Sequence, residues 1–162
     1  MKRWLIFFSL FHIGLFSQTT QVAPNVTLTL LDGKKVQLKD IASQGPVVVD
    51  FWATWCEPCK KEMVQLEKIY KKYKEQGLTI LAISQDSPRS LAKVKPYIRS
   101  KRFTYQVARD PNQQVGKKFN VQLLPTTFIV NSGMEIVWTH QGYIPGDEKK
   151  LETIILGLLG DE

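Results

Sequence analysis

The chain has 162 residues, of which 43% are hydrophobic and 23% are charged, and this is enough for one globular domain with a buried core. It has only two cysteines, so a scaffold held together by several disulfides is excluded. The formal net charge is +7, but no recognisable nucleic-acid motif accompanies it, and glutamates interleave with the lysines on helix-like segments. We therefore expect solvated helix faces and no nucleic-acid partner.

The N-terminus has the layout of an export signal. Two basic residues follow the first methionine, and a mostly apolar run then extends over residues 4–16 before polar residues begin. The run is short for a membrane-spanning helix, which needs about 20 residues. We predict a signal peptide or N-terminal membrane anchor at residues 1–18, with Ser17 the best cleavage candidate, followed by one domain at residues 19–162. The protein is thus expected in the periplasm or cell envelope.

The domain is predicted to begin with a linker, a hairpin and a buried strand. The linker covers residues 19–25. Residues 26–31 and 35–38 have the composition of strands, and the Asp-Gly pair between them suits a tight primed turn. After a turn at residues 44–46, residues 47–52 are apolar or aromatic without clean alternation. That pattern predicts a strand covered on both faces.

The middle of the chain alternates between predicted helices and strands. Residues 58–76 carry apolar residues at helical spacing, and Gly77 is a natural C-cap. Residues 78–83 predict a second buried strand. Residues 88–99 predict a helix that Pro96 can kink.

The last third is predicted to complete the sheet. A short strand is expected at residues 104–108, and a short helix follows from Asp110-Pro111 to about residue 120. Residues 126–130 and 135–139 predict strands that are antiparallel because their link is so short. Gly146-Asp147 caps a final amphipathic helix. The order predicts an α/β fold with a mixed sheet and helices on both faces.

The two cysteines, Cys56 and Cys59, stand two residues apart in the run Trp-Cys-Glu-Pro-Cys, where the first long helix begins. A disulfide between them closes a very small loop, and such a loop stabilises a fold little through chain entropy. We therefore predict a redox pair that opens and closes. Two ordinary core cysteines and half of a zinc site are the alternatives, although only His140 lies outside the leader as a further imidazole ligand.

The position of each cysteine predicts its role. Cys56 falls at the N-terminus of the helix, where free N–H groups and the helix dipole stabilise a thiolate, so Cys56 should attack substrate disulfides. Cys59 lies four residues before Met63 and seven before Leu66, on the face that points into the core. We expect Cys59 to be buried and protonated, and to resolve the mixed disulfide.

These motifs resemble a known family. The run at residues 55–59, the Leu-Pro-Thr-Thr-Phe run at residues 124–128 and an inserted region at residues 88–120 are similar to TlpA/ResA-like thiol–disulfide oxidoreductases, which are related to the redoxin and AhpC/TSA proteins. The resemblance covers about residues 26–159. It implies a thioredoxin-like fold with an N-terminal β-hairpin and a central inserted βα region, in an exported or membrane-tethered enzyme without a cofactor.

Two acidic residues are candidates for tuning the redox pair. Glu57 places a carboxylate next to Cys56, which disfavours the thiolate and predicts a reductase; the alternative is a solvated acid at a helix start. Asp50 ends a run of valines, where a buried carboxylate is unfavourable unless it is used. The resemblance implies that Asp50 accepts the proton of Cys59, although no lysine stands on the next strand, and an ordinary strand-end acid is the alternative. The family also carries an acid near the end of that next strand, for which Asp86 is the nearest candidate.

Four further residues are expected around substrate. Pro125 matches the cis-proline of the family, which keeps a backbone N–H away from the cysteines and leaves the Leu124 backbone free to pair with an extended peptide. Trp55 is expected to form an apolar rim beside Cys56, and Pro58 lies between the cysteines. We expect Trp55, Pro58 and Leu124 to bind substrate.

The resemblance implies a reductase of protein disulfides in exported proteins, apocytochrome c among them, with electrons from a membrane thiol donor. One alternative is a thiol peroxidase, but Ala53 stands where such a site places Thr or Ser, and Thr54 is only two residues before Cys56. A general disulfide oxidant or isomerase is a second alternative. A copper- or haem-handling module that uses Cys56, Cys59 and His140 is a third, although we expect no metal site.

Overall fold

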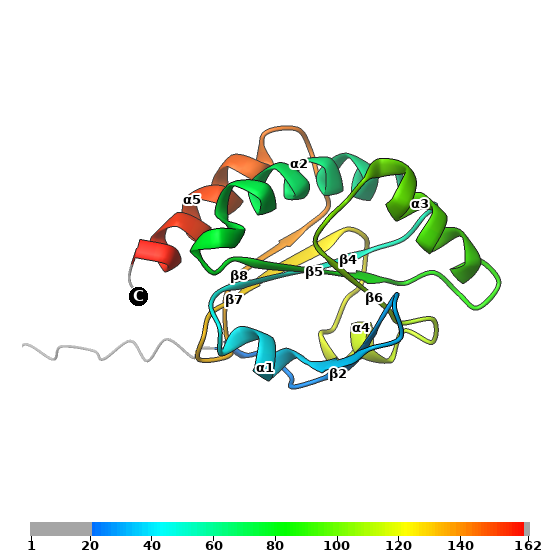
Figure 1. Ribbon diagram of the computed structural model, residues 1–162, viewed down its shortest axis with the longest axis horizontal. Helices are drawn as coiled ribbons and strands as arrows, with labels where there is room; N and C mark the ends of the chain where they lie inside the picture. The colour runs from blue at the N-terminus through cyan, green and yellow to red at the C-terminus, as the bar shows by residue number, and fades with distance from the viewer. Residues whose placement is uncertain (1–20, 161–162) are drawn as a thin grey trace, which may run out of the picture.

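The computed structural model describes residues 21–160, so the predicted leader and its cleavage site lie outside the described residues. One eight-stranded sheet forms the centre of the fold, with helices on both faces (Figure 1). Its strands follow the order β1-β8-β7-β4-β5-β6-β2-β3. The strands are β1 (Gln21–Val22), β2 (Thr27–Leu30), β3 (Lys35–Gln37), β4 (Val47–Trp52), β5 (Thr79–Ser84), β6 (Gln106–Arg109), β7 (Thr126–Val130) and β8 (Glu135–Gln141).

The sheet is mixed, as predicted. Strand β5 pairs in parallel with β4 and with β6, whereas the remaining neighbours pair antiparallel. The α-helices are α1 (Leu38–Ala42), α2 (Glu57–Tyr73), α3 (Val94–Lys101), α4 (Gln114–Lys118) and α5 (Asp147–Gly160), and short 3₁₀ turns at η1 (Lys74–Gln76) and η2 (Leu91–Lys93) adjoin α2 and α3. No helix among residues 21–160 is long and apolar enough to cross a membrane.

Strand β4 divides the core into two layers because its side chains alternate between the faces of the sheet. Val48 and Trp52 pack with residues of α2 and α5 on one face, whereas Val49 and Phe51 pack with residues of α1 on the other. Figure 1 shows α2, α3 and α5 on one side of the sheet, and α1 and α4 on the other. All six residues of β4 are buried, which confirms the predicted strand covered on both faces.

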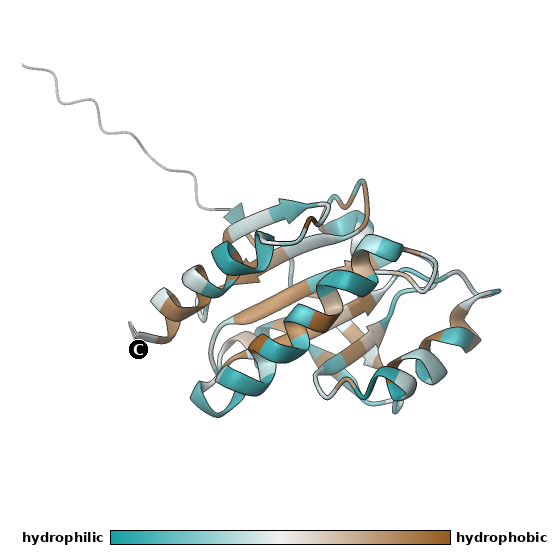
Figure 2. Ribbon diagram, turned by 90° about the horizontal axis from the view of Figure 1, so that it is seen from above, coloured by the Kyte–Doolittle hydropathy of each residue, from teal (hydrophilic) through white to brown (hydrophobic). Residues whose placement is uncertain are grey.

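Helix α2 lies over the centre of the sheet because one stripe of its surface is apolar. The stripe is formed by Cys59, Met63, Leu66, Ile69 and Tyr73, all of which are buried. Figure 2 shows that the central strands are hydrophobic (brown). Along the helix above them, hydrophilic (teal) and hydrophobic (brown) residues alternate. Each fully buried aliphatic side chain contributes about 2 kcal/mol through removal of apolar surface from water, so this stripe fixes α2 on the sheet.

The predicted boundaries were wrong at two places near the start of the domain. Within the predicted linker, Gln21–Val22 forms β1, which pairs with β8 at one edge of the sheet. The predicted second hairpin strand ends at Gln37, because Leu38, Ile41 and Ala42 turn into α1 and bury its apolar side. A helical turn of five residues is too short to leave a clear periodic signal.

The hairpin loop is also different from the predicted primed turn. The Leu30 N–H donates to the Lys34 carbonyl oxygen at 2.8 Å, and the Gly33 N–H donates to the Leu30 carbonyl oxygen at 3.0 Å. Three residues therefore form the loop, and only Gly33 among them has a positive φ, of 93°. A primed two-residue turn needs positive φ at Asp32 as well, and a glycine in the left-handed region is instead typical of a three-residue loop.

The helix predicted at residues 88–99 starts later than expected. A 3₁₀ turn at Leu91–Lys93 comes first, and α3 begins at Val94. Pro96 is therefore the third residue of α3 and lies in its first turn, where a missing N–H is tolerated. Pro96 thus marks the start of a helix and kinks nothing.

Candidate active site

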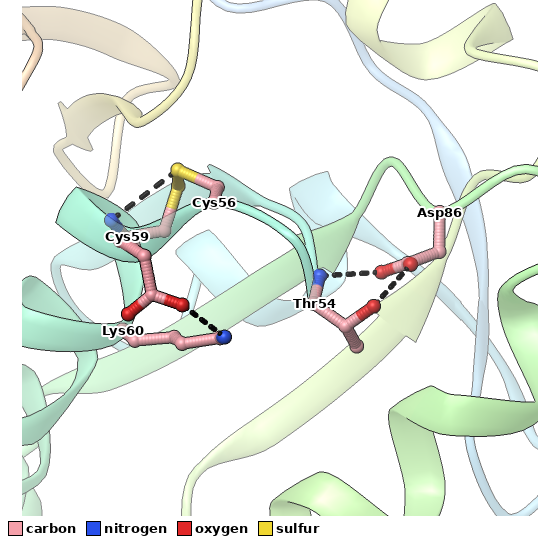
Figure 3. Close-up of polar contacts among 6 residues, drawn as sticks. Thr54, Cys56, Cys59, Lys60 and Asp86 are labelled. Atoms are coloured by element: carbon pink, nitrogen blue, oxygen red, sulfur yellow. Dashed lines mark hydrogen bonds and ion pairs between the residues drawn. A yellow bond between two sulfur atoms is a disulfide. The ribbon is translucent and has the colours of Figure 1, made fainter.

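Cys56 and Cys59 form a disulfide at the start of α2 (Figure 3). Cys56 is the N-cap residue of the helix, with an extended backbone, and the Cys59 N–H donates to the Cys56 Sγ at 3.3 Å. Cys56 is 5% exposed and Cys59 is fully buried. The structure therefore places Cys56 at the helix N-terminus and Cys59 on the inner face, as the sequence predicted, and an N–H aimed at Cys56 Sγ suits a thiolate there.

The loop before Cys56 is held by Asp86. The Thr54 N–H and hydroxyl donate to the two carboxylate oxygens of Asp86, at 2.9 and 2.6 Å (Figure 3). The Ser84 hydroxyl donates to the same carboxylate at 3.0 Å, and Asp86 is fully buried. The acid near the end of β5 is thus bound to the loop that leads into the redox pair, which fixes the approach of Cys56 to the helix.

Glu57 is the first residue of α2 and lies in solvent. Its side chain is 74% exposed, and the Lys60 Nζ lies 2.6 Å from its Oε1. The hydrogen bond from Lys60 lowers the Glu57 pKa, and the nearby positive charge of Lys60 lowers it further, so Glu57 is ionised. Because Lys60 supplies a matching positive charge one turn along the helix, Glu57 disfavours a Cys56 thiolate less than an isolated carboxylate would.

Asp50 is buried between β4 and α2. It belongs to β4 and shares the α2-facing side with Val48 and Trp52, since alternate residues of a strand share a face. Asp50 is fully buried, and neither carboxyl oxygen has a hydrogen-bond partner among residues 21–160. Burial raises the pKa of Asp50 well above its usual range, and the nearby Glu62 raises it further. Asp50 therefore holds a proton far more readily than an exposed aspartate.

Glu62 is a second buried acid, which the sequence analysis missed. It lies one helical turn after Cys59 on α2, is 4% exposed, and accepts a hydrogen bond from the Thr127 hydroxyl at 2.7 Å. Burial raises the pKa of Glu62 to about 7; the bond from Thr127 opposes this rise and Asp147 adds to it. A signal was present in the sequence, because Glu62 interrupts the apolar stripe between Cys59 and Met63.

Asp50 and Glu62 form one acid pair between β4 and α2. Thr127 is the strand neighbour of Asp50 across β4 and β7, and its hydroxyl contacts Glu62. Burial raises the pKa of both acids, and the charge of Glu62 raises the pKa of Asp50 further. A pair with this property, one turn from Cys59, can take up or release the proton of a thiol.

The bond between Leu124 and Pro125 is cis, as the resemblance implied. The Pro125 carbonyl accepts a hydrogen bond from the Gly142 N–H at 2.8 Å. The backbone N–H and carbonyl of Leu124 have no hydrogen-bond partner among the residues that the structure describes. Leu124 therefore presents a backbone that an extended peptide can pair with.

A small cavity of about 200 Å³ lies beside this loop. It is lined by Trp55, Gln85, Gln113, Val121, Gln122, Leu123 and Leu124. Trp55 is 64% exposed, whereas Trp52 is fully buried. The structure thus brings Trp55 and Leu124 together at one surface, while Pro58 is exposed at the second position of α2 and lines no part of this cavity.

The structure shows no group of three or more metal-ligating side chains among residues 21–160. His140 is engaged elsewhere, because its Nε2 lies 2.9 Å from Asp147 Oδ2 and its ring stacks on Trp138. The sulfurs of Cys56 and Cys59 are bonded to each other. No support for a copper- or haem-handling site arises from these residues.

The sequence matches the AhpC/TSA family over residues 19–139. The chain belongs to this family. Among its relatives is the thiol-disulfide oxidoreductase ResA of Bacillus anthracis, 38% identical over 120 residues that span 74% of this chain and 68% of that protein. ResA of Geobacillus kaustophilus is 33% identical over 150 residues, or 88% of this chain and 84% of the relative.

Solved structures of similar proteins agree with this placement in the family. A putative thiol:disulfide interchange protein DsbE from Chlorobium tepidum has a TM-score of 0.80 and 29% identity, over 87% of this chain and 97% of that one. A putative protein disulfide isomerase from Bacteroides thetaiotaomicron has a TM-score of 0.78 and 28% identity, over 87% of this chain and 89% of that one. The thioredoxin-like fold is confirmed, and this member of the AhpC/TSA family is a ResA-like thiol–disulfide oxidoreductase, as predicted.

Proposed function

We propose that the protein is exported and reduces disulfides in other exported proteins, including the haem-binding motif of apocytochrome c. The observation that carries this proposal is the buried acid pair Asp50–Glu62 between β4 and α2, with Glu62 one turn from Cys59. Trp55 and the Leu124 backbone line one surface that can receive a peptide. Electrons would come from a membrane thiol donor.

In the first step the Cys56 thiolate attacks one sulfur of the client disulfide. A bond forms between Cys56 Sγ and that sulfur, and the client's other sulfur leaves as a thiolate. The Cys59 N–H, 3.3 Å from Cys56 Sγ in the disulfide form, stabilises the attacking thiolate. Trp55 excludes water at one side, and the client backbone pairs with Leu124.

In the second step Cys59 releases the client. The Cys59 thiol passes its proton to the Asp50–Glu62 pair, and the resulting thiolate attacks Cys56 Sγ. The Cys56–Cys59 disulfide forms and the client's second sulfur leaves, so two electrons have passed from the enzyme to the client. The membrane donor dithiol then reduces the Cys56–Cys59 disulfide by the same two exchange steps in reverse, and is itself oxidised to a disulfide.

The direction of electron flow follows from the surroundings of the sulfurs. When Asp50 or Glu62 is ionised, its negative charge disfavours a thiolate at the nearby cysteine. A less stabilised thiolate makes the reduced form less stable and the couple more reducing. Glu57 acts in the same direction, weakened by its ion pair with Lys60.

A trapping experiment tests the proposal. Cys59→Ser should accumulate Cys56 in mixed disulfides with exported cysteine-containing proteins, and the double variant that also carries Cys56→Ser is the matched control that should trap nothing. A trapped set without exported cysteine proteins would contradict the assignment. An oxidised Cys-x-x-Cys-His peptide, with a peptide of the same composition and separated cysteines as control, tests the apocytochrome substrate.

The reduction potential decides between the proposal and its rivals. A potential near −120 mV, typical of a dedicated oxidant, would overturn the reductase assignment. The peroxidase alternative needs a Thr or Ser at the position of Ala53, and the neighbouring Thr54 hydroxyl donates to Asp86 at 2.6 Å. Peroxide turnover in the presence of dithiol should therefore be no faster than for free thiols. Fractionation of cells that produce the full chain tests export.

A further inference from the structure

The net positive charge of the protein is concentrated in one segment. Residues 87–109 contain seven lysines and arginines and no acid, whereas basic and acidic residues are equal in number in the rest of the chain. The seven, all exposed, are Arg89, Lys93, Lys95, Arg99, Lys101, Arg102 and Arg109. The interleaving of glutamates with lysines at residues 60–75 does not extend to this segment, which forms η2, α3 and β6.

None of the seven forms an ion pair with another residue in the described range 21–160. The two acids that border the segment do not offset it at the surface, since Asp86 is fully buried and Asp110 is 5% exposed. Both are already bound, Asp86 by Thr54 and Ser84 and Asp110 by Gln85 and the start of α4. The charge of this segment thus faces solvent uncompensated.

Three of these cations surround a groove. It has a volume of about 590 Å³, and its lining residues are Leu31, Pro88, Leu91, Ala92, Lys95, Pro96, Arg99 and Arg109. We call this the α3 groove. Its walls are aliphatic or proline side chains, and its charged residues are all positive. A concave apolar surface with convergent charge of one sign is typical of a binding site, and it attracts a ligand of opposite charge that also has an apolar part.

We propose that the α3 groove binds an acidic segment of a partner protein. Carboxylates of the segment would contact Lys95, Arg99 and Arg109, and an intervening apolar side chain would lie against Leu91 and Ala92. A membrane surface fits less well, because no large apolar side chain within residues 87–109 is among those that protrude into solvent. A basic surface without such side chains has nothing to insert between lipids.

Helix α3, which forms one wall of the α3 groove, also contacts the end of β4 and the first turn of α2. The Tyr97 ring of α3 is 5.5 Å from the Trp52 ring at the end of β4, and the Lys60 Nζ of α2 lies 5.9 Å from the same tyrosine ring. On the chain, Pro88 follows two residues after Asp86, which holds Thr54. A partner bound in the α3 groove therefore contacts the helix that packs against Trp52 at the end of β4. The inference concerns binding alone and stands whichever way electrons flow.

Fluorescence anisotropy with the full chain tests the inference. The probe is a labelled 12-residue peptide of alternating Asp and Leu, compared with Lys/Leu and Asp/Ser peptides. We expect the Asp/Leu peptide to bind best, and to bind about tenfold more weakly when NaCl rises from 50 to 300 mM. Equal binding of the Asp/Leu and Lys/Leu peptides would overturn the proposal.

Charge-reversal variants locate the site. Lys95→Glu/Arg99→Glu/Arg109→Glu should weaken Asp/Leu binding at least about tenfold. The matched control Lys39→Glu/Lys118→Glu/Lys150→Glu changes net charge equally at exposed positions outside the α3 groove, and should change the Kd less than about twofold. Equal losses in both would show attraction by net charge alone and overturn the proposal. Circular dichroism checks folding, and Arg99→Glu alone replaces the triple variant if that variant unfolds.

A final variant separates the groove from diffuse attraction. Ala92→Trp keeps every charge and fills the α3 groove, so peptide binding should weaken about tenfold. An unchanged Kd would overturn the proposal. Sedimentation with vesicles that contain phosphatidylglycerol tests whether the α3 groove binds a membrane. Residues 1–20 are the same in all variants, so any difference in vesicle binding between variants comes from the substituted residues. If the groove triple variant alone lost vesicle binding and its peptide binding were unchanged, the proposal of an acidic protein partner would be overturned.

Discussion

Replacement of Glu62 by glutamine should remove a pH dependence from the stability of the protein. The amide keeps the size of the side chain and can still accept the hydrogen bond that the Thr127 hydroxyl donates to Oε1 at 2.7 Å. The carboxylate lies on the apolar stripe of α2, where ionisation is disfavoured chiefly by burial. The variant therefore changes the charge and little else.

The magnitude follows from the pKa of Glu62, which burial raises from 4.5 to about 7. Between these values the unfolded chain loses the proton while the folded protein keeps it. The free energy of unfolding then falls as pH rises, by at most about 1.4 kcal/mol for each pH unit. The stabilisation is complete below the unfolded pKa and is lost as pH rises through the folded one. At pH 8 the ionised Glu62 should lower the stability of the folded protein by about 3 kcal/mol.

Urea unfolding of the oxidised protein at several values between pH 4.5 and 8 measures this effect. The difference between Glu62→Gln and the unchanged protein should be near zero at pH 4.5 and grow to about 3 kcal/mol in favour of the variant at pH 8. Glu75→Gln, at a side chain that is 87% exposed, is the control and should leave the pH profile unchanged. Parallel pH profiles for Glu62→Gln and the unchanged protein would refute the reasoning.

Three further predictions concern the loop, a backbone contact and the rim of the site. Asp86→Asn weakens the hold on the Thr54 N–H and hydroxyl, and should lower the free energy of unfolding by about 2 kcal/mol, as urea unfolding measures. Gly45→Ala should lower it by about 3 kcal/mol, because Gly45 has a φ of 142° and an added Cβ would lie 2.6 Å from the Gly77 carbonyl oxygen. Trp55→Ala should reduce kcat/KM for protein disulfides about tenfold in a turnover assay, because it removes the exposed apolar rim beside Cys56.

Each of these has an outcome that contradicts it. An Asp86→Asn protein as stable as the parent would mean that the loop is fixed by other contacts. A tolerated Gly45→Ala would show that the backbones at residues 45 and 77 separate easily. Trp55→Ala should keep its free energy of unfolding within about 0.5 kcal/mol, as for other surface substitutions, so a large stability loss would place Trp55 in the fold and not at the substrate surface.

Long periodic or continuously apolar segments were predictable from the sequence. The stripe from Cys59 to Tyr73 on α2 and the six buried residues of β4 gave strong signals because many residues agree. The mixed sheet followed from the order of these elements and the short link between β7 and β8. The placement of Cys56 and Cys59 depended on the same helix and was therefore also predictable.

Short secondary-structure elements and the pairing of charged side chains could not be predicted from the sequence. Strand β1 has two exposed residues and owes its existence to pairing with β8, which no local pattern reveals. The ion pair between Glu57 and Lys60 was present as an i, i+3 spacing, yet which way exposed side chains turn depends on the folded surface. Glu62 was missed because a helical stripe that contains one acid still resembles a core stripe, and only the folded structure shows that this acid is buried against Thr127.

The sheet ends in very short strands, and this restricts where another chain can attach. Among residues 21–160, strands β1 and β3 at the two edges have two and three residues, whereas the strands between them have four to seven. A long open edge recruits further strands and leads to self-association, and short edges offer few free backbone groups for it. The free backbone at Leu124 lies instead in a loop next to Trp55. In the proposed reaction a client strand therefore pairs at the Leu124 loop, beside Trp55, and not at the margins of the sheet.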